Sequence, residues 1–207
     1  MNLGPRLGLI DYGSGNLRSV SKALEAAGAH IMRLEQGPIA GSLDAIVLPG
    51  VGAFGDSVNQ LKRRDLFVPL QKWLNDGRRF LGVCLGFQLL FESSEESPGV
   101  AGLGVFAGQV RKFPREGVKV PQIGWNSVKW TEQANALYGN LPPDPYFYFV
   151  HSYYPQPQDE SIVAGYTEYG RRFAAAVATK NLLATQFHPE KSQESGLLLL
   201  RKFLDTL

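Results

Sequence analysis

Hydrophobic positions in the first half of the chain form short continuous runs that alternate with helix-like patterns. Four apolar runs predict buried strands at residues 6–11, 30–34, 44–48 and 79–83. Between the first two runs, residues 17–27 carry apolar side chains at intervals of three or four and end at Gly28, which is typical of a glycine-capped helix. This alternation of strand and helix favours a parallel sheet that is covered on both faces.

Two more helices are expected in this half. One begins with Asp56 as its N-cap and runs to about Asp76, with Gly77 as its stop. The other, over 85–92, follows directly on the fourth strand.

Beyond Pro98 the pattern changes to short strands separated by Gly, Pro and Asn. The predicted strands are 105–113, 118–123, 127–130, 146–153, 162–167, 173–178 and 182–187. Only residues 196–207 return to a helical pattern. The predicted fold class is therefore α/β, with one mixed, mostly parallel sheet flanked by helices and a β-rich second half, in a single domain over residues 1–207.

Composition excludes several classes of protein. Hydrophobic residues make up 44% of the 207 residues and the net charge is +2, which is globular and gives no support to nucleic-acid or membrane binding. One cysteine and three histidines exclude an intramolecular disulfide and argue against a metal site. We expect no cofactor. The longest apolar run is far shorter than the ~20 residues of a membrane span, and no basic signal region is evident, so we expect a cytoplasmic protein.

Cys84 lies where a buried strand turns directly into a helix, between Gly82 and Gly86. Hydrolases with a nucleophile elbow use this arrangement, because the sharp turn exposes the nucleophile and the glycines let the backbone crowd together. A helix N-terminus also favours the thiolate. The simpler alternative is a small buried hydrophobic residue.

A thiolate nucleophile needs a proton partner, and His188 lies at the end of the last predicted strand, where α/β sheets present functional groups. Glu190 stands two residues further on, so in extended chain its carboxylate lies on the same side as the ring and can accept from one ring nitrogen. The alternative is a surface pair around Pro189.

The oxygen of an attacked carbonyl needs hydrogen-bond donors. The N–H of Leu85, directly after the nucleophile, is one candidate, and the loop of Gly50, Val51 and Gly52 after the strand 44–48 is the other. This loop also reads as an ordinary glycine-rich turn.

The segments Gly-Val-Cys84-Leu-Gly-Phe-Gln88 and Gln-Phe-His188-Pro-Glu190 resemble those of the class I, triad-type glutamine amidotransferases. Segments 10–16, 49–54, 121–126 and 149–153 resemble the glutaminase subunits of imidazole glycerol phosphate synthases in histidine biosynthesis. The resemblance spans residues 10 to 192 and implies the flavodoxin-like architecture of that class. It implies Cys84, His188 and Glu190 as the catalytic triad. It further implies that glutamine is bound by Gln88, Glu96, His151, Ser152 and Tyr153. Without the family, Glu96 reads almost equally well as part of a solvated acidic loop.

The resemblance also implies a partner, a (β/α)8-barrel cyclase subunit that forms a heterodimer with this chain, takes up its ammonia and makes imidazole glycerol phosphate and aminoimidazole carboxamide ribotide. Ammonia released into water at neutral pH mostly becomes ammonium, and a chain of this length has no room for a second active site. The expected docking residues are Asn16, Gln122, Trp125 and Asn126. For Trp125 the alternative is ordinary core packing.

Val51 predicts a form of regulation. Several related amidotransferases have a second glycine in its place, and a β-branched residue is strained if the loop needs φ > 0 there. We therefore expect the oxyanion hole to be completed only when partner and acceptor bind.

Three other readings stay open from the residues alone. The first is a glutaminase subunit of another class I amidotransferase, of the anthranilate, aminodeoxychorismate or pyridoxal phosphate synthase type. The second is a thiol peptidase or stress hydrolase on a similar fold, and the third is a noncatalytic binding subunit.

Overall fold

The computed structural model describes residues 4–114, 116–139 and 141–207. The helices of these ranges are α1 (Leu17–Ala27), α2 (Phe54–Arg63), α3 (Phe67–Asn75), α4 (Leu85–Gln88), α5 (Glu132–Tyr138) and α6 (Gln193–Leu204), with 3-10 turns η1 (Glu160–Ile162) and η2 (Pro189–Lys191). The strands are β1 (Arg6–Ile10), β2 (His30–Leu34), β3 (Ala45–Leu48), β4 (Phe80–Val83), β5 (Phe91–Ser94), β6 (Phe106–Lys112), β7 (Gln122–Ser127), β8 (Lys129–Trp130), β9 (Tyr146–His151), β10 (Tyr153–Pro157), β11 (Val163–Glu168), β12 (Arg172–Thr179) and β13 (Leu182–Thr185).

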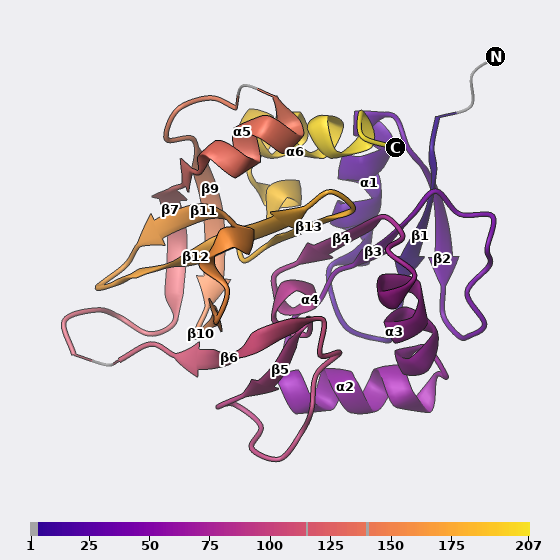
Figure 1. Ribbon diagram of the computed structural model, residues 1–207, viewed down its shortest axis with the longest axis horizontal. Coiled ribbons are helices and arrows are strands. Elements are labelled where there is room, and N and C mark those ends of the chain that lie inside the picture. Colours follow the sequence, from indigo (N-terminus) through magenta and orange to yellow (C-terminus); the bar gives the residue numbers. More distant parts are fainter. Residues whose placement is uncertain (1–3, 115, 140) are drawn as a thin grey trace.

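The largest sheet has eight strands in the order β2-β1-β3-β4-β13-β12-β11-β8. Its first five strands are parallel neighbours, and β12, β11 and β8 continue the sheet in antiparallel pairing. The predicted α/β class with a mixed sheet is confirmed. The expectation that one sheet takes up all strands is wrong, because β10-β6-β5 and β7-β9 form two smaller sheets beside it (Figure 1).

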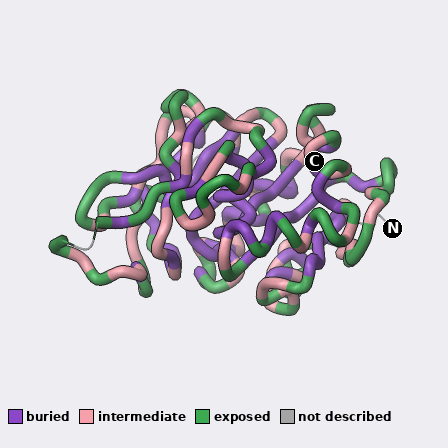
Figure 2. The backbone as a smooth tube through the Cα atoms, turned by 90° about the horizontal axis from the view of Figure 1, so that it is seen from below, coloured by how far each residue is buried: buried purple, intermediate pink, exposed green. Residues whose placement is uncertain are grey.

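Two hydrophobic cores lie on opposite faces of the large sheet. Helices α1, α5 and α6 cover one face, and α2 and α3 cover the other (Figure 1). Strand β3 serves both cores, because Ala45 and Val47 point to the first and Ile46 and Leu48 to the second. A strand buried on both faces reads as a continuous apolar run, which is why these strands were visible in the sequence. Figure 2 shows the buried residues running through the middle of the molecule.

The predicted helix over 56–76 is wrong as a single element, because α2 and α3 are separate helices. Asp65, between them, has a left-handed φ of 54°, and Pro69 lies in the first turn of α3, where its missing N–H costs nothing. The predicted stop at Gly77 is confirmed by its φ of 66° and its hydrogen bond to the Leu74 carbonyl.

Asp56 does not cap α2, which begins one turn earlier, after Ala53. The free N–H groups of Phe54 and Gly55 instead donate to Glu96 Oε2 at 2.7 Å and Ser97 Oγ at 2.9 Å. A cap supplied by residues forty positions away cannot be read from local sequence.

Three other expectations in the chain are corrected. The helix over 85–92 is the single turn α4, and β5 follows it because Phe91–Ser94 pairs with β6. The run over 146–153 is divided between β9 and β10, which join different sheets, and the strand expected over 118–123 begins only at Gln122. Helix α5 was not predicted, because its seven residues are too few to reveal a period; its cap is Thr131, which accepts from Ala134 N.

No helix in the described ranges combines the length and apolar character needed to cross a membrane.

Candidate active site

Three neighbouring parallel strands bring the predicted site together. Strand β4 lies between β3 and β13 and pairs with both in parallel. The loops that follow these strands therefore meet at the same edge of the sheet, as is usual for α/β sites. Residues Gly50–Gly52 follow β3, Cys84 follows β4, and His188 follows β13.

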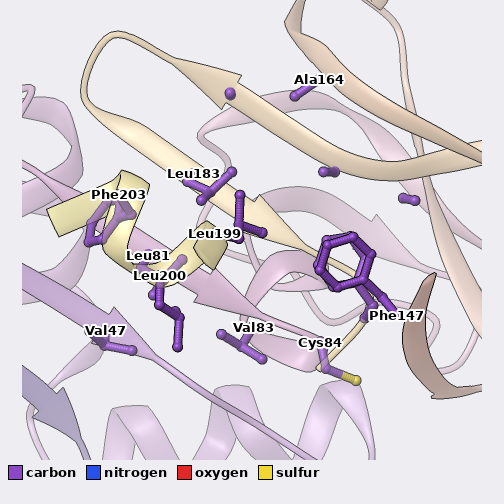
Figure 3. Close-up of a cluster of buried hydrophobic side chains, with 14 of the residues drawn as sticks. Val47, Leu81, Val83, Cys84, Phe147, Ala164, Leu183, Leu199, Leu200 and Phe203 are labelled. Carbon is purple, nitrogen blue, oxygen red and sulfur yellow. The ribbon is translucent and has the colours of Figure 1, made fainter. Parts of the chain in front are cut away.

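Cys84 occupies a strained turn between β4 and α4. Its φ of 54° and ψ of −107° are unusual for a residue with a side chain, and its N–H donates to the Thr185 carbonyl at 2.7 Å. A Cβ on Gly86 would lie 1.8 Å from the Leu48 carbonyl oxygen, and one on Gly82 would lie 3.1 Å from the Gly86 carbonyl oxygen. Glycine is therefore required at residue 86, and a side chain at residue 82 would be tightly crowded. Figure 3 shows the sulfur at the edge of the core cluster, beyond Val83.

His188 is held at the end of β13 by contacts on both sides. Its ring Nδ1 lies 2.8 Å from Glu190 Oε1, and each of the two side chains is 3% exposed. The backbone N–H of His188 donates to the Tyr148 carbonyl, and the His188 carbonyl accepts a hydrogen bond from Ser192 Oγ at 2.6 Å. The predicted His188–Glu190 contact is thus present, but Glu190 reaches the ring from the 3-10 turn η2 and not from extended chain.

The electrostatics around His188 favour a charged ring. Burial by itself lowers its pKa, but Cys84 and Glu190 outweigh burial and raise it to about 10. Ring Nε2 has no hydrogen-bond partner of ordinary geometry among the described residues, whereas the charge of Cys84 and side-chain hydrogen bonding toward it both raise the pKa of the ring. The arrangement therefore suits a thiolate–imidazolium pair with Glu190 behind it.

The loop expected to help form the oxyanion hole presents an oxygen to the site. The N–H of Leu85 donates to the Gly50 carbonyl at 3.4 Å, so the first predicted donor is engaged. The Val51 carbonyl accepts from Ser14 Oγ, and Val51 is outside the left-handed region, whereas Gly52 has a φ of 97°. The Gly50–Val51 peptide thus directs its carbonyl, and not its N–H, toward the elbow.

A cavity of about 290 Å³ opens beside the sulfur, near the lower end of the usual ~300–1,000 Å³ of small-molecule sites. Its lining is Val51, Gly52, Cys84, Leu85, Gln88, Glu96, Pro121, Val150, His151, Ser152 and Tyr153. All five residues expected to bind glutamine are in this set. His188, Glu190 and Gly50 do not line the cavity, and sequence reasoning gave no role in glutamine binding to Pro121 or Val150.

Polar side chains in the cavity are held in defined states. Gln88 Nε2 donates to the Tyr153 carbonyl at 3.0 Å, and one oxygen of Glu96 is engaged by α2. The ring Nδ1 of His151 contacts the same carbonyl at 2.7 Å, which leaves Nε2 without a partner among the described residues. Burial and, to a lesser extent, nearby His188 lower the pKa of His151 to about 4, although the contact with the Tyr153 carbonyl opposes this shift, so the ring is neutral at pH 7.

Gln186 is a polar residue of the site that sequence reasoning missed. It is fully buried and its Nε2 lies 3.6 Å from Cys84 Sγ. The available signal was a glutamine at the end of an otherwise apolar strand, two residues before His188.

The expected docking residues lie in different surroundings. Asn16 is exposed and caps α1 by accepting from the Ser19 N–H at 3.3 Å. On β7, Trp125 is 47% exposed and lies edge-on against Tyr148, Asn126 Nδ2 donates to a main-chain carbonyl, and Gln122 is buried. Core packing therefore does not account for Trp125.

Comparison with known proteins gives a consistent set of similarities. The model of the family "Glutamine amidotransferase class-I" matches residues 8–207. The chain is 46% identical over 202 residues to imidazole glycerol phosphate synthase subunit HisH of Thermosynechococcus vestitus, covering 97% of this chain and 96% of that protein. It is 46% identical to the subunit of the same name from Aquifex aeolicus, covering 94% of each. The structure of PurLQS from Thermotoga maritima shares the fold, with a TM-score of 0.77 and 18% identity over 98% of each chain.

Proposed function

On the premise that this chain belongs to the class I glutamine amidotransferases, among the HisH subunits of imidazole glycerol phosphate synthases, we propose that Cys84 is the nucleophile of its glutaminase reaction. Family membership confirms the resemblance read from the motifs and makes the chain a glutaminase. It does not favour the anthranilate, aminodeoxychorismate or pyridoxal phosphate synthase alternatives.

The reaction begins with attack of the Cys84 thiolate on the side-chain carbonyl carbon of glutamine. The carbonyl electrons move onto the oxygen, and the charged His188 ring then gives its proton to the amide nitrogen, so that ammonia leaves and a glutamyl thioester remains. Neutral His188 next takes a proton from water, whose oxygen attacks the thioester and releases glutamate. Glu190 holds the ring in place through Nδ1 in both steps.

The observation that carries this proposal is the lone cysteine in a strained elbow, at the wall of a small cavity, with a buried His188–Glu190 pair beside it. A diazoketone analogue of glutamine tests it. We expect one equivalent of the analogue to attach to the peptide that contains Cys84, and we expect excess glutamine to protect it. Attachment at another residue, or none, contradicts the assignment.

Regulation by the Gly50–Val51 peptide is part of the same proposal. With the Gly50 carbonyl on the Leu85 N–H, an oxyanion would meet a carbonyl oxygen where it needs a donor. Rotation of this one peptide would free the Leu85 N–H and add the Val51 N–H. The β-branched side chain of Val51 opposes that rotation, so we propose that binding of the partner and acceptor drives it.

The relatives are subunits of imidazole glycerol phosphate synthases, so a partner subunit is expected for this chain as well. We propose that the partner is the (β/α)8-barrel cyclase, that the two chains form a heterodimer in the cytoplasm, and that ammonia passes between them away from bulk water. The outward face of the β7-β9 sheet supports a docking surface: Ile123, Trp125 and Tyr146 are 59%, 47% and 60% exposed.

A further inference from the structure

Gln186 is a fully buried amide beside the nucleophile, and the mechanism above makes no use of it. It lies between β13 and His188 and is 0% exposed. Its Nε2 lies 3.6 Å from Cys84 Sγ, and its Oε1 accepts a hydrogen bond from Gln88 Nε2 at 3.1 Å. Since a buried amide is costly unless both of its polar ends are satisfied, the two contacts explain how this side chain is tolerated here.

The orientation of the Gln186 amide is set by a backbone carbonyl. Gln88 Nε2 also donates to the Tyr153 carbonyl at 3.0 Å, and a carbonyl oxygen can only accept. Gln88 therefore directs its NH₂ group toward Gln186, and Gln186 accepts this hydrogen bond through its side-chain oxygen. The remaining end of Gln186, its own NH₂ group, then faces Cys84. A reversed Gln186 would place its oxygen against the sulfur and its NH₂ group against that of Gln88.

A donor of this kind adds to the charge of His188 in stabilising the thiolate, because the helix after the elbow contributes little. Helix α4 has only four residues, and the Leu85 N–H is engaged by the Gly50 carbonyl. The dipole of a single turn is small. An N–H group aimed at the sulfur stabilises the charged form through a charge-assisted hydrogen bond.

We propose that Gln186 is a catalytic residue, which keeps Cys84 in its thiolate form through an Nε2–H···Sγ hydrogen bond, and that Gln88 positions it. This inference rests on the proposed glutaminase mechanism. As the sulfur attacks glutamine, its negative charge passes to the substrate oxygen, and the hydrogen bond from Gln186 weakens. Gln186 keeps its protons throughout, so proton transfer remains with His188.

Several titratable groups surround the sulfur and contribute to its pH behaviour. They are His188 and Glu190 after β13, Tyr12 after β1, His151 at the end of β9, and Glu96 after β5. The contribution of Gln186 is therefore measured as the difference in pH dependence between the full-length wild type and a full-length variant.

Alkylation by iodoacetamide is a direct probe, because Cys84 is the one cysteine in the sequence. We expect Gln186→Met to move the midpoint of the alkylation rate against pH upward by about one unit, which is about a tenfold loss of reactive thiolate below the midpoint. Thr185→Val is the matched control: Thr185 is equally buried, but its hydroxyl donates to the Phe187 carbonyl, so the midpoint should stay in place. If Gln186→Met folds and its alkylation midpoint equals that of the wild type, the proposal is overturned. This holds even if the variant is less stable to heat, because lower stability alone indicates only a structural role.

Gln88→Met provides a second route if Gln186→Met does not fold. The side-chain hydrogen bonds of Gln88 go to the Tyr153 carbonyl and Gln186 Oε1 and not to the sulfur, yet its loss frees the Gln186 amide to turn, so the midpoint should move in the same direction. The double variant Gln88→Met/Gln186→Met should have the same alkylation midpoint as Gln186→Met alone. A Gln88→Met midpoint equal to that of the wild type contradicts the proposal. Failure of the underlying mechanism is recognised separately, since glutamine turnover would then survive Cys84→Ser.

Discussion

At the scale of single residues, the position of Cys84, the proposed nucleophile, depends on the absence of a side chain at its neighbour Gly86. The elbow at Cys84 exists because Gly86 has no Cβ, and the carbonyl oxygen of Leu48 occupies the space where one would be. The backbone cannot yield easily there, because β3 and β4 are paired in the sheet.

Gly86→Ala tests this crowding. A Cβ placed 1.8 Å from a carbonyl oxygen must displace backbone, so we expect a loss of about 3 kcal/mol or more in the free energy of unfolding, or failure to fold. Gly41→Ala is the control, since a Cβ on Gly41 meets nothing within 4 Å, and its effect should be about 0.5 kcal/mol or less. Urea denaturation measures both. Equal effects at the two glycines would show that the elbow has room.

The His188–Glu190 pair predicts a pH-dependent contribution to stability. The pKa of His188 is raised in the folded chain, so its contribution is complete below the unfolded pKa of about 6.5 and is lost as the pH rises through about 10. Glu190→Gln should therefore cost about 2 kcal/mol at pH 6.5 and much less at pH 10.5. Denaturation of both proteins at the two pH values measures this difference. A cost that is the same at both pH values contradicts a charged His188.

The spacing of His188 and Glu190, taken together with the cysteine elbow at another strand end, indicated their pairing. The role of Gln186 was not predicted, because it depends on Gln88 and Tyr153, which lie far from it in the sequence. A contact between residues about a hundred positions apart leaves no local pattern.

At the scale of elements, the parallel arrangement of β3, β4 and β13 determines the site, and their apolar runs were readable from the sequence. The elements that were misread depend on distant partners. Strand β5 exists because it pairs with β6, and α2 begins where Glu96 and Ser97 cap it. Local propensity does not encode such contacts.

The loop after β3 carries the element-scale prediction. If Val51 opposes rotation of the Gly50–Val51 peptide, Val51→Gly should raise glutamine hydrolysis by the isolated chain about tenfold, because removing strain of ~1–3 kcal/mol lowers the barrier accordingly. Val51→Ala, which keeps a Cβ, should raise it less. A steady-state glutaminase assay without partner measures both variants. A rate in Val51→Gly that equals the wild-type rate would show that the loop does not limit turnover.

At the scale of the whole molecule, two cores stabilise the sheet while the β7-β9 face stays open to solvent. Trp125→Ala should change the free energy of unfolding by less than about 1 kcal/mol, because its side chain is 47% exposed, and should weaken binding of the cyclase subunit about thirtyfold or more. Lys129→Ala is the control, since Lys129 is an exposed residue of β8. Calorimetric titration with the cyclase measures binding. Unchanged affinity in Trp125→Ala would place the docking surface elsewhere.

The most direct test of the whole account is the activity of Cys84→Ala in complex with the cyclase subunit, assayed with its nucleotide substrate. With glutamine as the nitrogen source, the variant complex should form no imidazole glycerol phosphate, while added ammonium salt should support product formation as in the wild-type complex. Product formed from glutamine by the Cys84→Ala complex would contradict the claim that this cysteine generates the ammonia that the partner uses.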